Sequence, residues 1–195
     1  MSNDVNNYFL SEVVDFRQGY QFRGGIPDEI NGSVRVVQLK NVTQGNLKFW
    51  DSLLRTEIKS SKEPDWLRDN DVVFAARGTS NVAAVAIGVP PSTVCSPHLY
   101  VFRVKDGIKM LPEFLAWQLN QQPAQKYLAQ VAEGTHQLSI RRAELEQLQI
   151  RIPSIALQRS IIELDRVAIA ERQTLQALID NRKAELSAVA EKLLG

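Results

Sequence analysis

The stretch LRDNDVVFAARGTSNVAAVAI, residues 67–87, sets two apolar, β-prone runs on either side of the polar island RGTSN at 77–81. The runs at 72–76 and 82–89 have the length and composition of strands, and the turn-forming residues between them predict a β-hairpin. The tip carries a cation and three hydrogen-bonding side chains. The hairpin alone does not distinguish a simple turn from a tip that holds a polar partner.

The sequence around this hairpin alternates between strand and helix patterns. Further strands are predicted at residues 34–39, 47–50, 98–104 and 149–152. Helices are predicted at 7–16, 112–119, 123–134 and 139–148. Residues 51–71 are mostly charged and are expected to be irregular. This order predicts an α+β domain with a mixed, mainly antiparallel sheet and short helices over residues 1–153.

After Pro153 the composition changes, because residues 154–194 contain no glycine, proline or aromatic residue. One long helix is predicted over 154–195, with apolar residues in an approximate coiled-coil spacing. The residues expected to form a dimer interface on this helix are Leu157, Ile161, Leu164, Ala168, Leu175, Leu178, Leu186 and Val189. The pattern is interrupted by charges such as Glu171 and Arg182, and near Asp180 it fits a period of 3.6 better than 3.5.

A helix of this length extends roughly 60 Å at ~1.5 Å per residue, too far to bury its apolar stripe against a small domain. The stripe therefore predicts a partner helix, and the simplest partner is a second copy of the chain. The alternative is a hairpin that folds back near residues 180–183. No glycine or proline lies there to make the bend.

Composition restricts the function classes only weakly. The chain has 195 residues and a net charge of +1, which does not indicate nucleic acid by itself. The single cysteine, Cys95, allows no internal disulfide and is expected to be a small buried hydrophobe in a reducing, cytoplasmic compartment. No apolar run approaches the ~20 residues of a membrane span, and no signal-peptide core opens the chain.

The motifs of catalysis are missing from the sequence. No glycine-rich phosphate loop or dinucleotide fingerprint occurs, and two histidines with one cysteine are too few for a metal site of soft ligands. His98 lies in an apolar strand pattern and is expected to be buried. Asp69 and Asp71 precede a strand and are expected in a solvated loop. These observations favour a binding module over an enzyme.

Four polar loops carry the side chains that read base edges, namely Arg, Asn, Gln, Ser and Thr. These loops are residues 17–23, 40–44, 77–81 and 135–142. The first two of these loops lie in a stretch, residues 17–48, with five cations and two anions. The tip residue Arg77 is expected to contact a base, whereas Arg141 and Arg142 are expected to hold phosphates. The complete set of candidate DNA-binding residues is Arg17, Gln18, Tyr20, Arg23, Lys40, Asn41, Gln44, Arg77, Thr79, Ser80, Asn81, Thr135, His136, Gln137, Arg141 and Arg142.

Short motifs recur in a particular order along almost the whole chain. They are RVVQLKNV at 35–42, LxxxDVVFAARGT at 67–79, HLYVFRV at 98–104, LPxFL at 111–115, GTHQ at 134–137, LxxLxIxIP at 145–153 and IALQRxII at 155–162. This order resembles the specificity subunits of type I restriction-modification systems. Members of that family often have Pro-Pro followed by a Glu-Gln pair before the long helix, and this chain departs from that pattern at residues 152–159.

The resemblance implies a target recognition domain followed by a helical spacer. Full-length members carry this unit twice, so the chain is expected to be a half-length subunit that forms a homodimer through antiparallel helices. The dimer would read double-stranded DNA at an interrupted inverted repeat. A methyltransferase subunit would bind S-adenosylmethionine, and a restriction subunit would use ATP and Mg²⁺. This chain would hold no cofactor or metal of its own and would perform no catalysis.

Two other readings of the sequence remain open. The chain would alternatively be a non-catalytic protein-interaction scaffold with a coiled-coil dimerisation helix. It would otherwise be an enzyme acting on nucleic acid, which the missing motifs disfavour.

Overall fold

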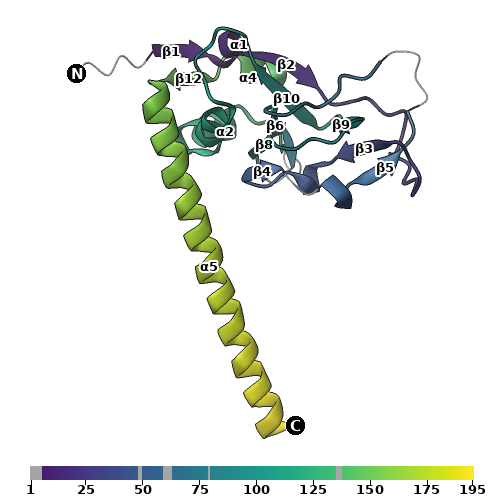
Figure 1. Cartoon of the computed structure of the whole chain (residues 1–195), viewed down its shortest axis with the longest axis vertical. Coiled ribbons are helices and arrows are strands. Elements are labelled where there is room, and N and C mark those ends of the chain that lie inside the picture. The colour runs from purple at the N-terminus through teal and green to yellow at the C-terminus, as the bar shows by residue number, and fades with distance from the viewer. Residues whose placement is uncertain (1–5, 48–49, 59–62, 79, 135–137) are drawn as a thin grey trace. The chain divides into compact units, whose positions relative to one another are not determined.

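The computed structural model describes residues 6–47, 50–58, 63–78, 80–134 and 138–195. The chain divides into two compact units, residues 1–158 and residues 159–195. The first unit contains all the strands and the short helices, and the second is made of one long helix (Figure 1). The mixed α+β class with largely antiparallel sheets, short helices and a long C-terminal helix is confirmed.

A five-stranded sheet forms the centre of the first unit, in the order β2-β10-β6-β8-β4. The strands are β2 (Val14–Gln18), β10 (Leu99–Val104), β6 (Val72–Ala75), β8 (Ala83–Ala86) and β4 (Gly45–Leu47). β6 and β8 pair antiparallel, so the predicted hairpin is confirmed. Only β4 runs parallel to its neighbour, β8. All residues of β6 and β8 are buried, which explains their continuous Val and Ala composition.

The predicted helix at residues 7–16 is wrong. This segment forms β1 (Asn6–Phe9), a single helical turn α1 (Leu10–Val13) and the start of β2. β1 pairs antiparallel with β12 (Gln149–Ile152), and β2 pairs with β10. The apolar spacing suits a helix locally, but two distant strand partners supply the backbone hydrogen bonds instead. Tertiary pairing therefore overrides the local helical pattern.

A second sheet has three strands in the order β5-β3-β9. β3 (Val34–Val37) was predicted, whereas β5 (Leu54–Thr56) and β9 (Thr93–Cys95) were not. β5 lies in the region expected to be irregular. β3 pairs antiparallel with β5 and parallel with β9. Strands of three residues are too short to show a clear alternation, so their partners decide their conformation.

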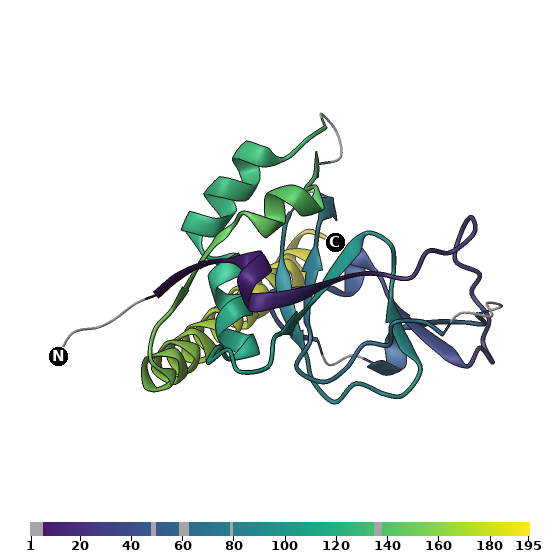
Figure 2. The same cartoon turned by 90° about the horizontal axis from the view of Figure 1, so that it is seen from above.

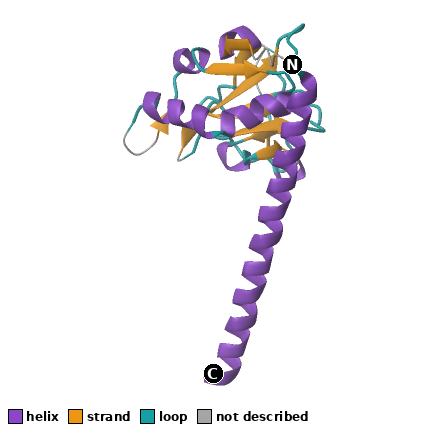
Figure 3. Ribbon diagram, turned by 90° about the vertical axis from the view of Figure 1, so that its left-hand side faces the viewer, coloured by secondary structure: helices purple, strands orange, loops and turns teal. Residues whose placement is uncertain are grey.

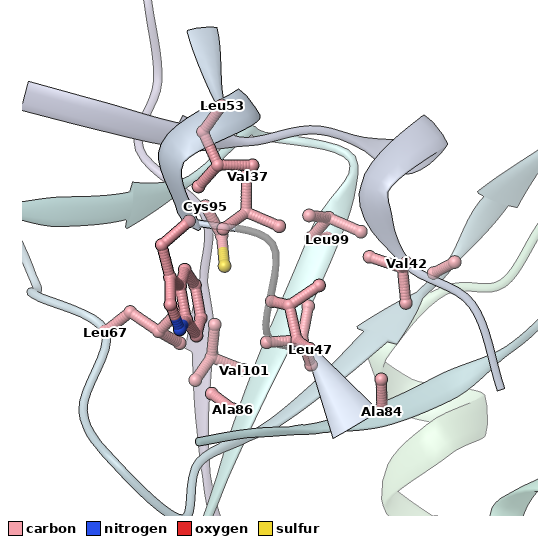
Figure 4. Close-up of a cluster of buried hydrophobic side chains, with 13 residues drawn as sticks. Val37, Val42, Leu47, Leu53, Leu67, Ala84, Ala86, Cys95, Leu99 and Val101 are labelled. Carbon is pink, nitrogen blue, oxygen red and sulfur yellow. The ribbon is translucent and has the colours of Figure 1, made fainter. Parts of the chain in front are cut away.

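The two sheets share a core that includes Val37 and Cys95 from the second sheet and Leu99 and Val101 from the first (Figure 4). Cys95 is 2% exposed, as expected for a small buried hydrophobe. Burial raises the pKa of its thiol, and the nearby Asp71 carboxylate adds to this effect. The thiol is therefore un-ionised at neutral pH and inaccessible.

Asp71 contradicts the expectation of a solvated loop, because it is 1% exposed. Its two oxygens accept hydrogen bonds from Arg103 Nε at 2.8 Å and Nη2 at 2.7 Å. The Arg68 amide also donates to Asp71. Asp69 is exposed, as expected, and accepts a hydrogen bond from the Val89 amide. The Arg103 partner lies in β10, so the local sequence gives no sign of the ion pair.

The remaining helices of the first unit are α2 (Pro112–Asn120), α3 (Gln122–Val131) and α4 (Arg142–Glu146). α4 is shorter than predicted, because Leu138–Ser139 forms strand β11. β11 pairs with β7 (Arg77–Gly78) at the hairpin tip. Two 3-10 turns, η1 (Leu39–Asn41) and η2 (Trp50–Ser52), complete the unit.

Helix α5 (Ile155–Leu194) is continuous (Figure 3). The alternative of a fold-back near residues 180–183 is therefore wrong. Near its start, Gln158 is 0% exposed and makes three hydrogen bonds within the first unit. Its Oε1 accepts from the Leu111 amide, and its Nε2 donates to the carbonyls of Lys109 and Pro153.

Replacing Gln158 with Ala leaves the amide of Leu111 and two carbonyls buried without partners. We expect Gln158→Ala to lower the free energy of unfolding by about 2–4 kcal/mol, measured by urea denaturation. The control is Gln176→Ala, which removes only an exposed hydrogen bond to Asp180 and should change stability by less than ~0.5 kcal/mol. Equal effects of the two changes would contradict the role given to the buried amide.

Gly19 allows the chain after β2 to pass against residues 95–99. Its amide donates to the Leu99 carbonyl and the next amide, of Tyr20, to the Cys95 carbonyl. A Cβ at Gly19 would overlap the Ser96 carbonyl oxygen, whereas one at Gly25 would meet no atom within 4 Å. We expect Gly19→Ala to destabilise the protein by about 1–3 kcal/mol or more and Gly25→Ala to change it little. Thermal unfolding checks this, and a neutral Gly19→Ala would refute the close approach.

Candidate nucleic-acid interface

One end of the five-stranded sheet collects loops that are far apart in the sequence. The register sets Gln18 beside Tyr100, Leu99 beside Ala75, Phe74 beside Ala83, and Gly45 beside Ala84. β2 and β6 therefore end here, while β10, β8 and β4 begin here. In Figure 2 the purple β2 runs alongside the teal β10. We call this region the loop end; it comprises residues 17–23, 38–44, 76–82 and 96–98.

The fourth candidate loop, residues 135–142, joins the loop end through β7 and β11. Arg77 lies opposite Ser139, and the Ile140 amide donates to the Ala76 carbonyl at 2.9 Å. The hairpin tip therefore also takes part in a second, short antiparallel strand pair, β7 with β11. Strand topology thus brings the first three loops and residues 138–140 of the fourth to one side of the first unit, whereas Arg142 lies over Phe16 in the middle of β2. Thr79, Thr135, His136 and Gln137 lie outside the described residues.

Arg77 and His98 lie side by side at the centre of the loop end. Arg77 Nη1 is 3.4 Å from His98 Nδ1, and both residues are exposed. The expectation that His98 is buried is wrong, because β10 begins at Leu99 and His98 precedes it. His98 is therefore a further candidate site residue, which the sequence reasoning missed. The only signal for it was its position at the boundary of a strand.

The first loop begins at the edge strand β2. Arg17 Nη1 contacts both oxygens of Asp65, at 2.7 and 2.6 Å, so its charge is already offset. Gln18 is exposed, and its Nε2 makes a long 3.5 Å contact with the Pro97 carbonyl. Tyr20 packs edge-on against Phe22 at 4.8 Å between ring centroids. Arg23 is exposed.

A groove beside this loop is lined by Tyr20, Phe22 and Trp66, together with charged side chains. Carboxylates outnumber cations there, since the charged lining residues are Arg23, Arg68, Glu29, Glu57, Glu63 and Asp65. An anionic ligand is therefore disfavoured in this groove. Within the loop end, the side that contains Arg77 and His98 is the better place for a polyanion.

The second loop contributes Lys40, Asn41 and Gln44. Lys40 and Gln44 are exposed, so their polar ends are available to a partner. Asn41 is partly buried, and its side-chain oxygen accepts a hydrogen bond from the Gln38 amide at 2.9 Å. Asn41 therefore also stabilises the turn η1.

At the hairpin tip, Ser80 is exposed and Asn81 is not. Asn81 is 8% exposed, and its Nδ2 donates to the Ala75 carbonyl at 2.9 Å. The expectation that Asn81 faces a ligand is therefore corrected: its amide satisfies a carbonyl at the end of β6. The short side chain is well suited to this role, because it reaches nearby backbone groups.

Arg141 and Arg142 are exposed, but each already has a carboxylate partner. Arg141 Nη2 lies 2.6 Å from Glu133, and Arg142 Nε lies 2.7 Å from Glu146. The Arg142 guanidinium also lies over the Phe16 ring, 5.4 Å from its centroid. A phosphate would have to compete with these contacts, although exposed ion pairs are weak.

Neither a metal cluster nor a membrane helix is found in the part of the chain that the structure describes. No group of three or more His, Cys, Asp or Glu residues there could hold a metal ion. None of the helices there combines the length and the apolar character needed to cross a bilayer.

Three solved structures share this fold. The S subunit of the type I restriction-modification system from M. genitalium is 17% identical, with a TM-score of 0.59 over 93% of this chain and 43% of that one. The HsdS subunit from Thermoanaerobacter tengcongensis is 18% identical, with a TM-score of 0.59 over 91% and 40%. A chain from a structure of type I R-M complex assembly and conformational transition is 18% identical, with a TM-score of 0.61 over 99% and 44%.

The chain spans less than half the length of each of these relatives, and such low identities show the fold alone. No curated protein matches the sequence. A sequence model described as "Type I restriction modification DNA specificity domain" matches residues 2–177, which is most of the chain. The chain therefore belongs to the family of type I restriction-modification DNA specificity domains.

Proposed function

We propose that this chain selects the DNA sequence on which a type I restriction-modification complex acts, and that the loop end makes the sequence-specific contacts. One observation carries the proposal: sheet topology gathers three polar loops, and residues 138–140 of a fourth, at a single end of the sheet. A rigid sheet below and variable loops above is the arrangement that recognition sites commonly use.

The residues best placed to read bases are exposed and not committed to a carboxylate. Arg77 matches the acceptor pair on guanine, and Gln44 matches the donor and acceptor on adenine. His98 and Ser80 lie beside Arg77 at the tip and offer single hydrogen bonds. Lys40 supplies a point charge for a phosphate.

Catalysis in the proposed complex belongs to other subunits. A methyltransferase subunit would bind S-adenosylmethionine and a restriction subunit would use ATP and Mg²⁺, while this chain supplies sequence choice and a scaffold. We place it in the cytoplasm with the DNA that it would read.

We further infer that α5 pairs with the same helix of a second copy. Its apolar side chains form one stripe that is left open to water. Leu164, Leu175, Leu178, Leu186 and Val189 are between 53% and 71% exposed. Exposed leucines at this spacing are the usual mark of a helix that packs on another helix.

Two charges within the stripe favour an antiparallel arrangement. Glu171 and Arg182 are equally far from a point between residues 176 and 177. A two-fold axis at that point sets Glu171 of one copy against Arg182 of the other, and Leu175 against Leu178. A parallel pair in register would instead set each charge against its own kind, which is unfavourable.

The present partner of Arg182 does not oppose this pairing. Arg182 Nη1 lies 2.8 Å from Glu185 on its own helix, and both side chains are more than half exposed. Such exposed pairs contribute little, so Arg182 is free to exchange partners at low cost.

The DNA-binding proposal is tested by selection from a random-sequence DNA pool, with and without the methyltransferase subunit. We expect enrichment of an interrupted inverted repeat, since a two-fold protein reads a two-fold site. Absence of any enriched motif in both arms would favour the alternative, a scaffold that binds only protein.

With the selected sequence, Arg77→Ala should lower affinity for the cognate DNA by about 1–3 kcal/mol and leave binding to random DNA nearly unchanged. The control is Arg172→Ala, because Arg172 is exposed on α5 without an ion pair among the described residues. Fluorescence anisotropy at one fixed salt concentration measures both. Unchanged discrimination in Arg77→Ala would remove the tip from the recognition surface.

The helix pairing is tested by exchanging the two stripe charges. Glu171→Arg and Arg182→Glu should each weaken the dimer roughly 10- to 100-fold, and the double variant should recover, as measured by analytical ultracentrifugation. Parallel helices give no recovery, because like charges still meet in every variant. A wild-type monomer at micromolar concentration would refute the pairing altogether.

A cysteine at position 164 provides an independent check. In the antiparallel register Leu164 faces Val189, so Leu164→Cys alone should not form a disulfide, whereas a mixture with Val189→Cys should. The native Cys95 is buried and does not interfere.

A further inference from the structure

Arg35 on β3 and Arg55 on β5 lie directly opposite each other in the antiparallel pair. Side chains at opposed positions project from the same face of a sheet, a few ångströms apart. Both residues are partly exposed, so neither guanidinium is shut off from solvent. Two like charges in this position destabilise a sheet unless an anion lies between them.

Neither arginine forms an ion pair with a carboxylate among the residues that the structure describes. The Glu57 carboxylate, next along the same face, accepts hydrogen bonds from Ser33. Four other arginines of the first unit do have a carboxylate partner: Arg17 has Asp65, Arg103 has Asp71, Arg141 has Glu133 and Arg142 has Glu146. Arg35 and Arg55 are, like Arg77, cations without such a partner in the described part of the chain, and they are the two that lie directly opposite each other.

Arg35 is also incompletely hydrogen-bonded. Its Nε is buried and has no partner, although the amide of the same residue donates to the Ser92 carbonyl. Thr93, on the other side of Arg35 in the same row, gives its hydroxyl to the Pro90 carbonyl. A buried guanidinium nitrogen without an acceptor is costly, and Arg17 Nε is in the same state. Because Arg35 Nε has almost no accessible surface, an anion from outside would have to meet the other nitrogens of the partly exposed guanidinium.

The location fits a ligand that also contacts the loop end. The Ser96 amide donates to the Val37 carbonyl, so β3 ends at the loop end. Arg35 is two residues back along this strand, roughly 7 Å at ~3.3 Å per residue. Both faces of this sheet carry buried side chains: Val34, Val36 and Val94 pack against aromatic side chains on one, and Val37 and Cys95 enter the shared core on the face of Arg35. Arg35 and Arg55 remain partly exposed beside that core.

We propose that Arg35 and Arg55 together clamp a phosphate group. Arginine is suited to this task because its planar donors match the oxygens of a phosphate in pairs. The phosphate is assigned to the DNA backbone that flanks the bases read at the loop end, and this assignment rests on the proposed function. The same chemistry would take free phosphate, so the test has an arm for each source.

The DNA arm measures how affinity depends on salt for Arg55→Gln, Arg35→Gln and Arg55→Lys. Loss of one phosphate contact lowers the slope of log K against log salt by about 0.9, so the affinity ratio between 50 and 200 mM salt shrinks roughly 3- to 4-fold. Both Gln variants should show this loss equally on cognate and random DNA. Arg55→Lys keeps the charge and should retain most of the slope.

Arg159→Gln is the matched control, because Arg159 is exposed and has no ion pair in the described part of the chain. It makes the same chemical change outside the clamp and should leave the slope unchanged.

The phosphate arm follows thermal unfolding in inorganic phosphate against chloride at equal ionic strength. Phosphate should stabilise the wild-type protein and not Arg55→Gln. Without added phosphate, Arg55→Gln should melt at a temperature equal to or above the wild type, because it relieves a like-charge contact. A marked fall in melting temperature would show that Arg55 supports the sheet instead, and would overturn the proposal.

The two arms separate the possible outcomes. A reduced slope in both Gln variants supports the clamp with DNA as its ligand. Stabilisation by phosphate with unchanged slopes supports a clamp for free phosphate. No effect in either arm overturns the clamp. A wild-type protein that selects no DNA refutes the proposed function, and the phosphate arm still decides on the clamp.

Discussion

The ladder of the five-stranded sheet is the constraint on which the other features depend. Because β2, β10, β6 and β8 alternate in direction, the loops that leave β2 and β6 and those that enter β10 and β8 fall at the same end of the sheet. β4 runs parallel to β8 and so starts at the same end. Every residue of β6 and β8 is buried, so both faces of these strands pack against other parts of the first unit. The Asp71–Arg103 ion pair joins the start of β6 to β10 at the opposite end of the sheet.

The distribution of charge on the first unit separates structural from available cations. Arg17, Arg103, Arg141 and Arg142 are paired with carboxylates of the same unit, and these contacts tie neighbouring segments together. The unpaired cations are the ones that a polyanion would meet first. The net charge of +1 does not reveal this division, because it adds together the cations that are paired with carboxylates and the cations that are not.

The sequence predicted the features that have a local cause. The β6–β8 hairpin follows from two apolar runs around a polar turn, and α5 follows from forty residues without glycine, proline or aromatic side chains. Features that depend on partners far away in the sequence were not predicted. Residues 7–16 have an apolar spacing typical of a helix, but they pair instead with strands about ninety and a hundred and forty residues away in the sequence. Asp71 was expected to be solvated and Asn81 to face DNA, because their partners, Arg103 and the Ala75 carbonyl, are brought to them only by folding. The four candidate loops were found individually, and only the topology shows that three of them and part of the fourth meet.

The attachment of the hairpin tip to the helices behind it bears on how new specificities arise. The Asn120 side chain accepts a hydrogen bond from the Ala83 amide and donates one to the Ala83 carbonyl. Gln125 Nε2 donates to the carbonyls of Asn81 and Leu119. These amides fix the end of the tip that leads into β8, without using the side chain of Ser80 or Arg77. Point substitutions at those outward positions therefore leave the supporting bonds intact. Evolution or directed mutagenesis can therefore change the side chains at these few positions while the supporting structure stays the same. A library confined to these positions would sample altered targets without loss of folding.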